Sequence, residues 1–409
     1  MTFPAAVRPP ASFVLLLGAM AALPAVTTDL YLPSLPDVAR DLETSAALVQ
    51  ATITGVLIGG AAGQILIGPL SDRYGRRAPV LIGISVHIVA SLLAAIAPSI
   101  IPLLALRVIQ GVGNSAAMVS AMAVIRDRYS GAGASVILSR LMLVVGVAPL
   151  FAPTVGGFIA HLWGWRANFT VLAILGLILL LVVARALPET HPPERRVARG
   201  IGGTARSYGV LLADRQFMAL ALLPGLGLGA LMSYVAGSPF VLREGYGLSE
   251  NAFALLFAIN GAGLVLGSQI NASLVRRFEP LKVIRVAIPL AMLLAVVLVA
   301  VAATGAGGLV GLMTPLWFML AVNALVPPNA SALALTRHGE RAGTAAALIG
   351  AMQAGVAGIV SPLVGVLGGD AVAMATVILG AVAAAFVVLV VATPAYRRGG
   401  GEAPAGEPA

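Results

Sequence analysis

Long apolar segments, separated by short polar or charged ones, recur along the whole chain. Each is about 20 residues long, the length that a helix needs to cross the hydrocarbon core of a bilayer. The pattern predicts an all-α membrane protein with twelve transmembrane helices, the ninth and tenth being divided at Thr304–Gly308. The predicted spans are 12–33, 47–70, 78–97, 100–125, 135–160, 167–187, 216–241, 250–275, 283–303, 307–335, 342–367 and 370–392.

The composition supports a membrane protein and argues against several other classes. Of the 409 residues, 59% are hydrophobic and only 10% are charged, whereas a soluble domain has about a quarter charged residues. The chain has no cysteine, and its four histidines form no metal-binding motif. There is no Walker A loop, so ATP is not the expected energy source, and no metal or cofactor is expected. The basic residues lie in short loops, so nucleic acid is not an expected partner.

The distribution of basic residues predicts the orientation in the membrane. An even number of spans places both chain ends on one side, and cytoplasmic loops are normally enriched in Lys and Arg. With the N-terminus inside, all but four of the 25 basic residues fall on the cytoplasmic side. The exceptions are Arg40, Arg166 and Arg243, which lie outside, and Arg107, which lies within a span. We therefore expect a multi-pass protein of a bacterial cytoplasmic (inner) membrane with both termini in the cytoplasm.

The polar segments and a weak internal repeat predict two related halves. The longest polar segment, 188–215, is expected to be a cytoplasmic linker between six-helix halves at 1–187 and 216–392. Residues 393–409 are rich in Gly, Pro and charge, and we expect a disordered cytoplasmic tail. Leu141–Gly157 resembles Gly350–Val366, with glycines and a proline superposed. Such a repeat is typical of transporters built from two halves.

Two charged residues within predicted spans are candidates for function. Asp29 is the one carboxylate well inside any predicted span, and Arg107 lies inside the fourth span. Charges within the bilayer are costly and usually functional, and a carboxyl group there can exchange protons as its surroundings change. The alternatives are an acid at the outer interface for Asp29 and a side chain extending to that interface for Arg107. Their span positions place both in the outer half of the membrane, so we predict that they act together in a proton cycle.

Two further motifs lie in the first half. The loop between spans two and three contains Gly68, Asp72, Arg73, Gly75, Arg76 and Arg77. A basic inside loop with a glycine turn is its simplest interpretation. Span five contains Gly146, Pro149, Pro153, Gly156 and Gly157, which ordinary helix packing and bending would also explain.

Taken together, these segments resemble the major facilitator superfamily. The loop motif resembles the signature of that family, and Arg107 with Gln110, Gly111 and Gly113 resembles its span-four motif. The span-five glycines and prolines are similar to a motif found chiefly in antiporters, and Thr28–Pro36 resembles span one of the Bcr/CflA drug-resistance branch. The resemblance implies a major facilitator fold, a latch in which Asp72 faces a helix of the other half, pairing of Arg76 with Asp127, and proton coupling at Asp29.

The predicted function is a proton-coupled antiporter that exports drugs or other small amphipathic molecules by alternating access. It is a secondary transporter rather than an enzyme, without catalytic residues, and a monomer is expected. Its partners would be a drug-like substrate, protons and the lipid bilayer. The alternatives are an exporter or importer of a specific metabolite, and a membrane receptor that does not transport. Seven residues are predicted from span position to line a central cavity: Tyr31, Gln110, Asn114, Phe151, Tyr234, Asn260 and Gln353.

Overall fold

The computed structural model describes residues 10–129, 137, 140–141, 151–192, 194, 201–338 and 341–392. Within these ranges the regular elements are all helical. The first half contains α1 (Ala11–Asp29), η1 (Leu32–Ser34), α2 (Leu35–Asp41), α3 (Ala46–Tyr74), α4 (Arg77–Ala95), α5 (Ile100–Arg128) and α7 (Arg166–Ala186). The second half contains α9 (Arg215–Ser238), η3 (Pro239–Gly245), α10 (Glu250–Leu274), α11 (Pro280–Thr304), α12 (Gly308–Asn323), α13 (Val326–Thr336), α14 (Ala342–Val360), α15 (Leu363–Val366) and α16 (Ala371–Ala392).

The helices match the predicted spans closely. Eleven helices in the described part of the chain are long and apolar enough to cross a membrane. The predicted span five, 135–160, lies largely outside the described residues, but its final part, 151–163, is helical. The predicted division at Thr304–Gly308 is a turn in which Gly305, Gly307 and Gly308 have positive φ angles of 68°, 72° and 54°. Glycine suits this turn because it adopts left-handed backbone conformations without strain.

Four spans in the described part of the chain are interrupted beside prolines, which lack a backbone donor. One of them is the span Ala342–Val366, where α14 ends at Val360 and α15 begins just after Pro362. The first span runs from Ala11 to Asp41 but changes from α1 to η1 just after Asp29. The seventh passes from α9 into the π-helical η3 at Pro239, and the tenth divides into α12 and α13 before Pro327 and Pro328. Interruptions within the membrane are tolerated where protein surrounds them, and they commonly lie near transport sites.

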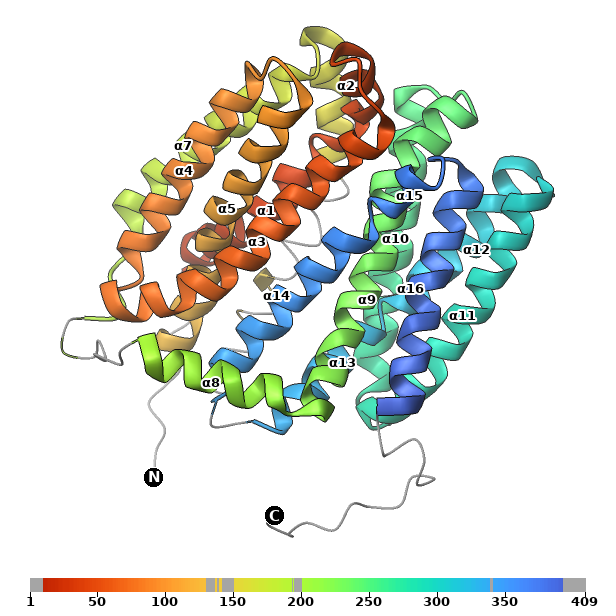
Figure 1. Ribbon diagram of the computed structural model, residues 1–409. Coiled ribbons are helices and arrows are strands. Elements are labelled where there is room, and N and C mark those ends of the chain that lie inside the picture. Colours follow the sequence, from red (N-terminus) through yellow and green to blue (C-terminus); the bar gives the residue numbers. More distant parts are fainter. Residues whose placement is uncertain are drawn as a thin grey trace.

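The two halves stand side by side in Figure 1, with the red-to-yellow helices on one side and the green-to-blue helices on the other. Helix α14 of the second half runs along α3 of the first and forms the main contact between the halves among the described residues. Helix α8 (Ile201–Ala213), within the predicted linker, lies across the lower end of the molecule. Elements α2 and α15 lie at the opposite end.

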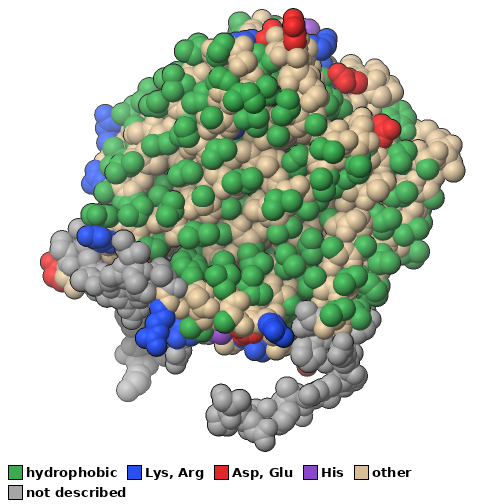
Figure 2. Space-filling view, viewed as in Figure 1, with side chains coloured by type: hydrophobic (Ala, Val, Ile, Leu, Met, Phe, Trp, Pro, Cys, Tyr) green, Lys and Arg blue, Asp and Glu red, His purple; other side chains and the backbone are tan. Residues whose placement is uncertain are grey.

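The surface matches a bilayer environment. Figure 2 shows a broad hydrophobic surface across the middle of the visible face, with charged side chains gathered toward the two ends. Ile82, Val286 and Val310, for example, are 64%, 68% and 74% exposed. So many exposed aliphatic side chains would be unfavourable in water and are expected against lipid.

Candidate functional site in the cavity between the halves

A cavity of about 260 Å³ lies between the two halves. The first half contributes residues of α1, α3 and α5 to its wall, and the second half contributes residues of α9, α10 and α14. Its surface is mainly aliphatic and aromatic, including Met118, Met232, Tyr234 and Phe257. Apolar cavities with a few convergent polar groups are typical of small-molecule sites, and methionine adapts to ligands of different shape.

Asp29 is the one acid in this wall, which contains no Arg, Lys or His among the described residues. It is the last residue of α1, and its side chain is almost buried, at 6% exposed. Pro24 lies one turn earlier, and its carbonyl accepts a 3.1 Å hydrogen bond from the Thr28 hydroxyl. Among the described residues, Asp29 has no ion pair. An unpaired carboxylate in an apolar cavity is costly to keep charged, so a proton or a cationic group is its natural partner.

Arg107 lies on α5, behind the cavity wall, with its side chain fully buried. It donates hydrogen bonds to the Thr27 carbonyl at 3.3 Å and to Gln110 Oε1 at 2.6 Å. Its guanidinium group lies 4.9 Å from the centre of the Tyr31 ring and 5.6 Å from that of Phe169. This burial rules out the alternative of a side chain that reaches the outer interface. Arg107 contacts the helix end that carries Asp29, but it forms no ion pair with the Asp29 carboxylate.

The structure separates the seven predicted cavity residues into three groups. Asn114 and Tyr234 line the cavity. Three others lie behind the wall: Gln110 donates to Ser91 at 2.7 Å, Asn260 donates to the Tyr234 hydroxyl at 2.9 Å, and Tyr31 is buried against Arg107. Each of these three therefore supports a neighbouring group instead of lining the cavity.

The remaining two cavity predictions, Phe151 and Gln353, need correction. Phe151 is 63% exposed, and Gln353 is half-buried beside Ala354, the α14 residue that does line the cavity. The error arises because adjacent helical residues point about 100° apart, so depth in a span does not determine the direction of a side chain. Sequence reasoning also missed Gln64, Ser115 and Phe257 in the wall. A polar Gln64 within span two was the available signal.

The loop after α3 forms a compact ion-pair cluster around Arg76, which is buried at 3% exposed. Arg76 binds both oxygens of Asp127, at 2.8 and 3.3 Å, and Asp72 Oδ1 at 2.5 Å. Burial by itself would lower the pKa of Arg76, but the bonds to Asp127 and Asp72 hold that pKa above its usual value. The neighbouring Gly75 has a φ of 91°, a conformation that favours glycine.

Two residues that follow α7 complete this cluster and were not anticipated from the sequence. Glu189 accepts hydrogen bonds from the backbone N–H groups of Arg76 and Arg77 at 2.8 and 3.2 Å, and Thr190 donates to Asp127 at 3.0 Å. Arg77 also donates to the Ala184 carbonyl, and Arg73 lies over the Tyr74 ring at 5.3 Å.

The loop motif that contains Asp72 and Arg76 makes no hydrogen bond or ion pair with the described residues of the second half. Asp72 is 56% exposed and pairs with Arg76 of its own half. At Gly68, an added Cβ would meet no atom of the described residues within 4 Å.

The described part of the span-five motif packs against the interruption that follows Asp29. A Cβ added to Gly156 would lie 1.8 Å from the Leu30 carbonyl oxygen, and one on Gly157 would lie 3.6 Å from Pro33 Cβ. Glycine at 156 is therefore required for the two backbones to meet. Pro153 is buried. Gly146 and Pro149 lie outside the described residues.

An all-helical membrane protein with an apolar cavity between two groups of helices has an architecture that suits a transporter. A family model described as Major Facilitator Superfamily matches residues 14–362. The chain belongs to the major facilitator superfamily, and it is a transporter rather than an enzyme. The fold class predicted from the sequence is thereby confirmed.

Similar proteins of known sequence place the chain among drug-resistance relatives of the Bcr/CflA type. It is 39% identical over 364 residues to an uncharacterized transporter of this superfamily, YdgK of Bacillus subtilis, covering 88% of this chain and 90% of that protein. It is 31% identical to a bicyclomycin resistance protein homolog of Haemophilus influenzae, covering 90% and 92%. It is also 31% identical to a chloramphenicol resistance protein of Pseudomonas aeruginosa, covering 78% and 76%.

Solved structures are similar to the fold. A D-xylose–proton symporter superposes with a TM-score of 0.71 at 19% identity, covering 92% of this chain and 96% of the symporter. The xylose transporter XylE of E. coli gives 0.73 at 16% identity, covering 93% and 97%. At these identities, the likeness concerns the fold alone.

Proposed function

We propose that this transporter is a proton-coupled antiporter that exports drug-like amphipathic molecules from the cytoplasm. The observation that carries the proposal is the position of Asp29, the one acid in an apolar cavity shared by the two halves. A neutral apolar wall accepts molecules of many shapes. The single carboxylate provides one site at which a proton and a substrate can exclude each other.

The mechanism follows from this exclusion. Substrate entering from the cytoplasm would displace the proton from Asp29, and the loaded halves would then rock to open the cavity outward. A proton arriving from outside would in turn favour substrate release and the return step. Coupling requires that proton and substrate bind the two facing states with different affinities, because a ligand with equal affinity for both states shifts neither.

The relatives support drugs as the cargo, since two of them are named for resistance to bicyclomycin and chloramphenicol.

The orientation proposed from the loop charges places α8 and the Arg76 cluster in the cytoplasm, and α2 and α15 outside. Export across a bacterial cytoplasmic membrane would then protect the cell. The two halves, 1–187 and 216–392, would act as the rocking units, and the Asp72 motif would be a latch at the inner face. The protein would act as a monomer, because a single chain contributes the described walls of the cavity from both halves.

Drug-resistance profiling combined with a transport assay tests the proposal. A drug-sensitive bacterium expressing the chain should tolerate more bicyclomycin, chloramphenicol or another compound of a broad panel. Purified protein in liposomes should then move protons against that compound, as reported by an enclosed pH-sensitive dye. Flux of the compound without proton movement would contradict proton coupling. A response limited to one metabolite would favour the alternative of a specific exporter or importer.

A further inference from the structure

Three arginines on the proposed outer face, Arg40, Arg166 and Arg243, run against the cytoplasmic bias of the other basic residues. Each has an acidic partner. Arg40 pairs with Asp37 and Arg166 with Asp41, and both of these pairs lie within the first half. Arg243 belongs to the second half, yet it reaches Asp37 of the first. Of the three, it is therefore the one that joins the halves.

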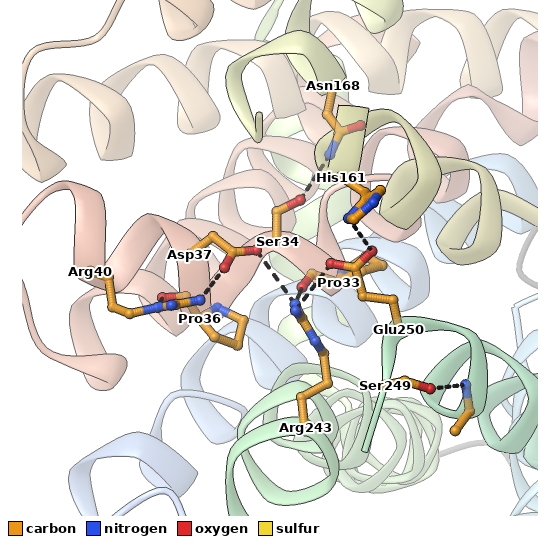
Figure 3. Close-up of polar contacts among 11 residues, drawn as sticks. Pro33, Ser34, Pro36, Asp37, Arg40, His161, Asn168, Arg243, Ser249 and Glu250 are labelled. Atoms are coloured by element: carbon orange, nitrogen blue, oxygen red, sulfur yellow. Dashed lines mark hydrogen bonds and ion pairs between the residues drawn. The ribbon is translucent and has the colours of Figure 1, made fainter. Parts of the chain in front are cut away.

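Figure 3 shows Arg243 at the centre of a cluster of groups from both halves. Its Nη1 donates to the Pro33 carbonyl at 2.5 Å and lies 3.4 Å from Asp37 Oδ2. Its Nη2 donates to Glu250 Oε1 at 3.1 Å, and His161 Nδ1 lies 4.0 Å from the other Glu250 oxygen. The Arg243 side chain is only 15% exposed. A planar guanidinium suits this arrangement, because its fixed fork can serve several acceptors at once.

The Pro33 carbonyl oxygen can accept a hydrogen bond from Arg243 because of the proline three residues later in the sequence. Pro36 has no N–H, so it cannot donate the hydrogen bond that a carbonyl three residues earlier would receive in η1. Pro33 also lies four residues after Asp29, in the short interruption that separates α1 from α2. Arg243 therefore holds the segment that directly follows the cavity acid.

A second observation on the same face shows that the backbones of the two halves are in direct contact there. Gly365 of α15 packs on the first turn of α3, where an added Cβ would lie 2.6 Å from Ala47 Cα and 2.9 Å from Ala47 N. Backbone atoms cannot move aside as a flexible side chain can, so a larger residue would force the outer ends apart. By contrast, a Cβ on Gly355 of α14 would meet nothing within 4 Å.

We propose that Arg243 is the positioning residue of an outer gate, which closes the cavity to the outside by binding the Pro33 carbonyl and Asp37. Gly365 allows the backbone contact that completes the closure. When the outer ends separate, Arg243 loses both first-half partners and retains Glu250 of its own half. Movement of the segment after Asp29 thereby couples occupation of the cavity to opening of the gate. The proposal rests on alternating access in the proposed function, but its test needs neither a proton gradient nor a drug.

The test measures access to the cavity from outside. The native chain has no cysteine, so an Ala354→Cys variant provides one reactive thiol on the cavity wall. Intact cells are treated with a membrane-impermeant maleimide, and the labelling rate is followed on the purified protein. Adding Arg243→Ala should raise this rate on the order of tenfold, the effect of losing a charged hydrogen bond that is made in one state only. Arg243→Lys, which keeps the charge but not the fork, should give an intermediate rate.

Arg40→Ala is the matched control, because Arg40 binds the same Asp37 without crossing between the halves. Its labelling rate should equal that of the background variant. An unchanged rate in Arg243→Ala would overturn the proposal. An equal increase in Arg40→Ala would also overturn it, because loss of any outer charge would then account for the effect.

Gly365→Ala tests the gate without removing a hydrogen bond, and it serves if Arg243→Ala does not reach the membrane as folded protein. It should also raise outside labelling of Ala354→Cys, whereas Gly355→Ala should not. Yield and a single symmetric peak in size-exclusion chromatography report folding of each variant. A Gly365→Ala rate equal to that of Gly355→Ala would contradict a tight outer closure, whatever the outcome of the drug and proton assays.

Discussion

At the scale of single residues, the two charged residues within spans of the first half, Arg107 and Asp29, have different surroundings. Arg107 is enclosed by a backbone carbonyl, the Gln110 amide and two aromatic rings. Asp29, by contrast, faces the cavity and has no ion partner among the described residues. The arginine is therefore placed to support the end of α1, and the acid is placed to meet what enters the cavity. A buried charge is stable only when its surroundings satisfy it.

The first prediction concerns the cavity acid. Asp29→Asn keeps the size of the side chain but removes proton exchange, so proton-linked drug efflux should fall to the level of cells without the transporter. Membrane insertion and yield should be unchanged, since Asp29 lines the cavity and has no ion pair with the described residues. Asp370→Asn is the control, because this exposed acid caps α16 and Asn caps equally well. Full resistance in the Asp29→Asn strain would show that proton coupling lies elsewhere.

The second prediction separates support from direct coupling at Arg107. Arg107→Ala should abolish efflux and lower thermal stability, because it leaves the Thr27 carbonyl and Gln110 without their donor. Arg107→Lys should retain part of both, since it keeps the charge and one donor but loses the planar group over Tyr31 and Phe169. Efflux assays and melting of the purified variants measure the two effects. Full efflux in Arg107→Ala would exclude the role assigned to it.

At the scale of elements, several of the residues discussed above lie at the ends or interruptions of helices. The break between α1 and η1 lies beside Asp29, and the π-helical turn of η3 carries Arg243. Asp214 is the N-cap of α9, and its Oδ1 accepts hydrogen bonds from the Gln216 and Phe217 N–H groups. The other oxygen of Asp214 receives Arg337 at 3.2 Å and His338 at 2.9 Å. One acid thus caps α9 and ties it to the end of α13.

The third prediction is a pH-dependent contribution of this cap. Partial burial opposes ionisation, but the bonds from Phe217, His338 and Arg337 hold the pKa of Asp214 below its usual value. The ionised group therefore adds stability above its ordinary pKa of about 4, and this contribution is lost as pH falls through the lower, folded-state pKa. Asp214→Ala should cost about 1 kcal/mol at pH 7, and the cost should shrink in acid.

Melting of purified protein between pH 7 and the acid limit of its solubility provides the measurement. Ser249→Ala is the matched control, because Ser249 caps α10 through a neutral hydroxyl that accepts from the Ala252 N–H at 3.3 Å. Its cost should not vary with pH. Parallel curves for the two variants would contradict an electrostatic role for Asp214.

At the scale of the whole molecule, the proposed outer and inner faces differ in how the two halves contact each other. On the proposed outer face, Arg243 joins the halves. On the proposed inner face, Asp72 pairs with Arg76 of its own half, and no atom of the described residues lies within 4 Å of a Cβ added to Gly68. The proposed outer gate is thus closed, whereas the proposed inner latch is not formed. This combination fits a transport cycle in which the outer and inner faces close alternately.

The fourth prediction follows from this opposition. Asp72→Ala should weaken closure of the inner face and so favour the state closed to the outside, lowering outside labelling of Ala354→Cys. Arg243→Ala should raise it. Because the two sites are far apart and share no partner, their effects should add, and the double variant should lie between the single ones. A double variant labelled as fast as Arg243→Ala alone would show that Asp72 does not bias the equilibrium.

The sequence by itself determined the membrane class, the positions of the helices and the identity of the cavity acid. These features depend on local properties: a segment of about 20 apolar residues is stable only in lipid as a helix, and a lone carboxylate such as Asp29 stands out against it. The pairing of Arg76 with Asp127, implied by family resemblance, is present at 2.8 Å. The roles assigned to Asp29, Arg107 and the loop motif around Asp72 remain predictions for the experiments above.

Only the tertiary structure decided which side chains meet. Depth in a span was readable from the sequence, but the azimuth of each residue was not, so Phe151 and Gln353 fell outside the cavity while Gln64 and Phe257 line it. The same limit hid the contact of Arg243 with Pro33, whose residues are 210 positions apart. Direction around a helix axis and contact between distant segments depend on how the helices pack, and packing is a property of the assembled bundle.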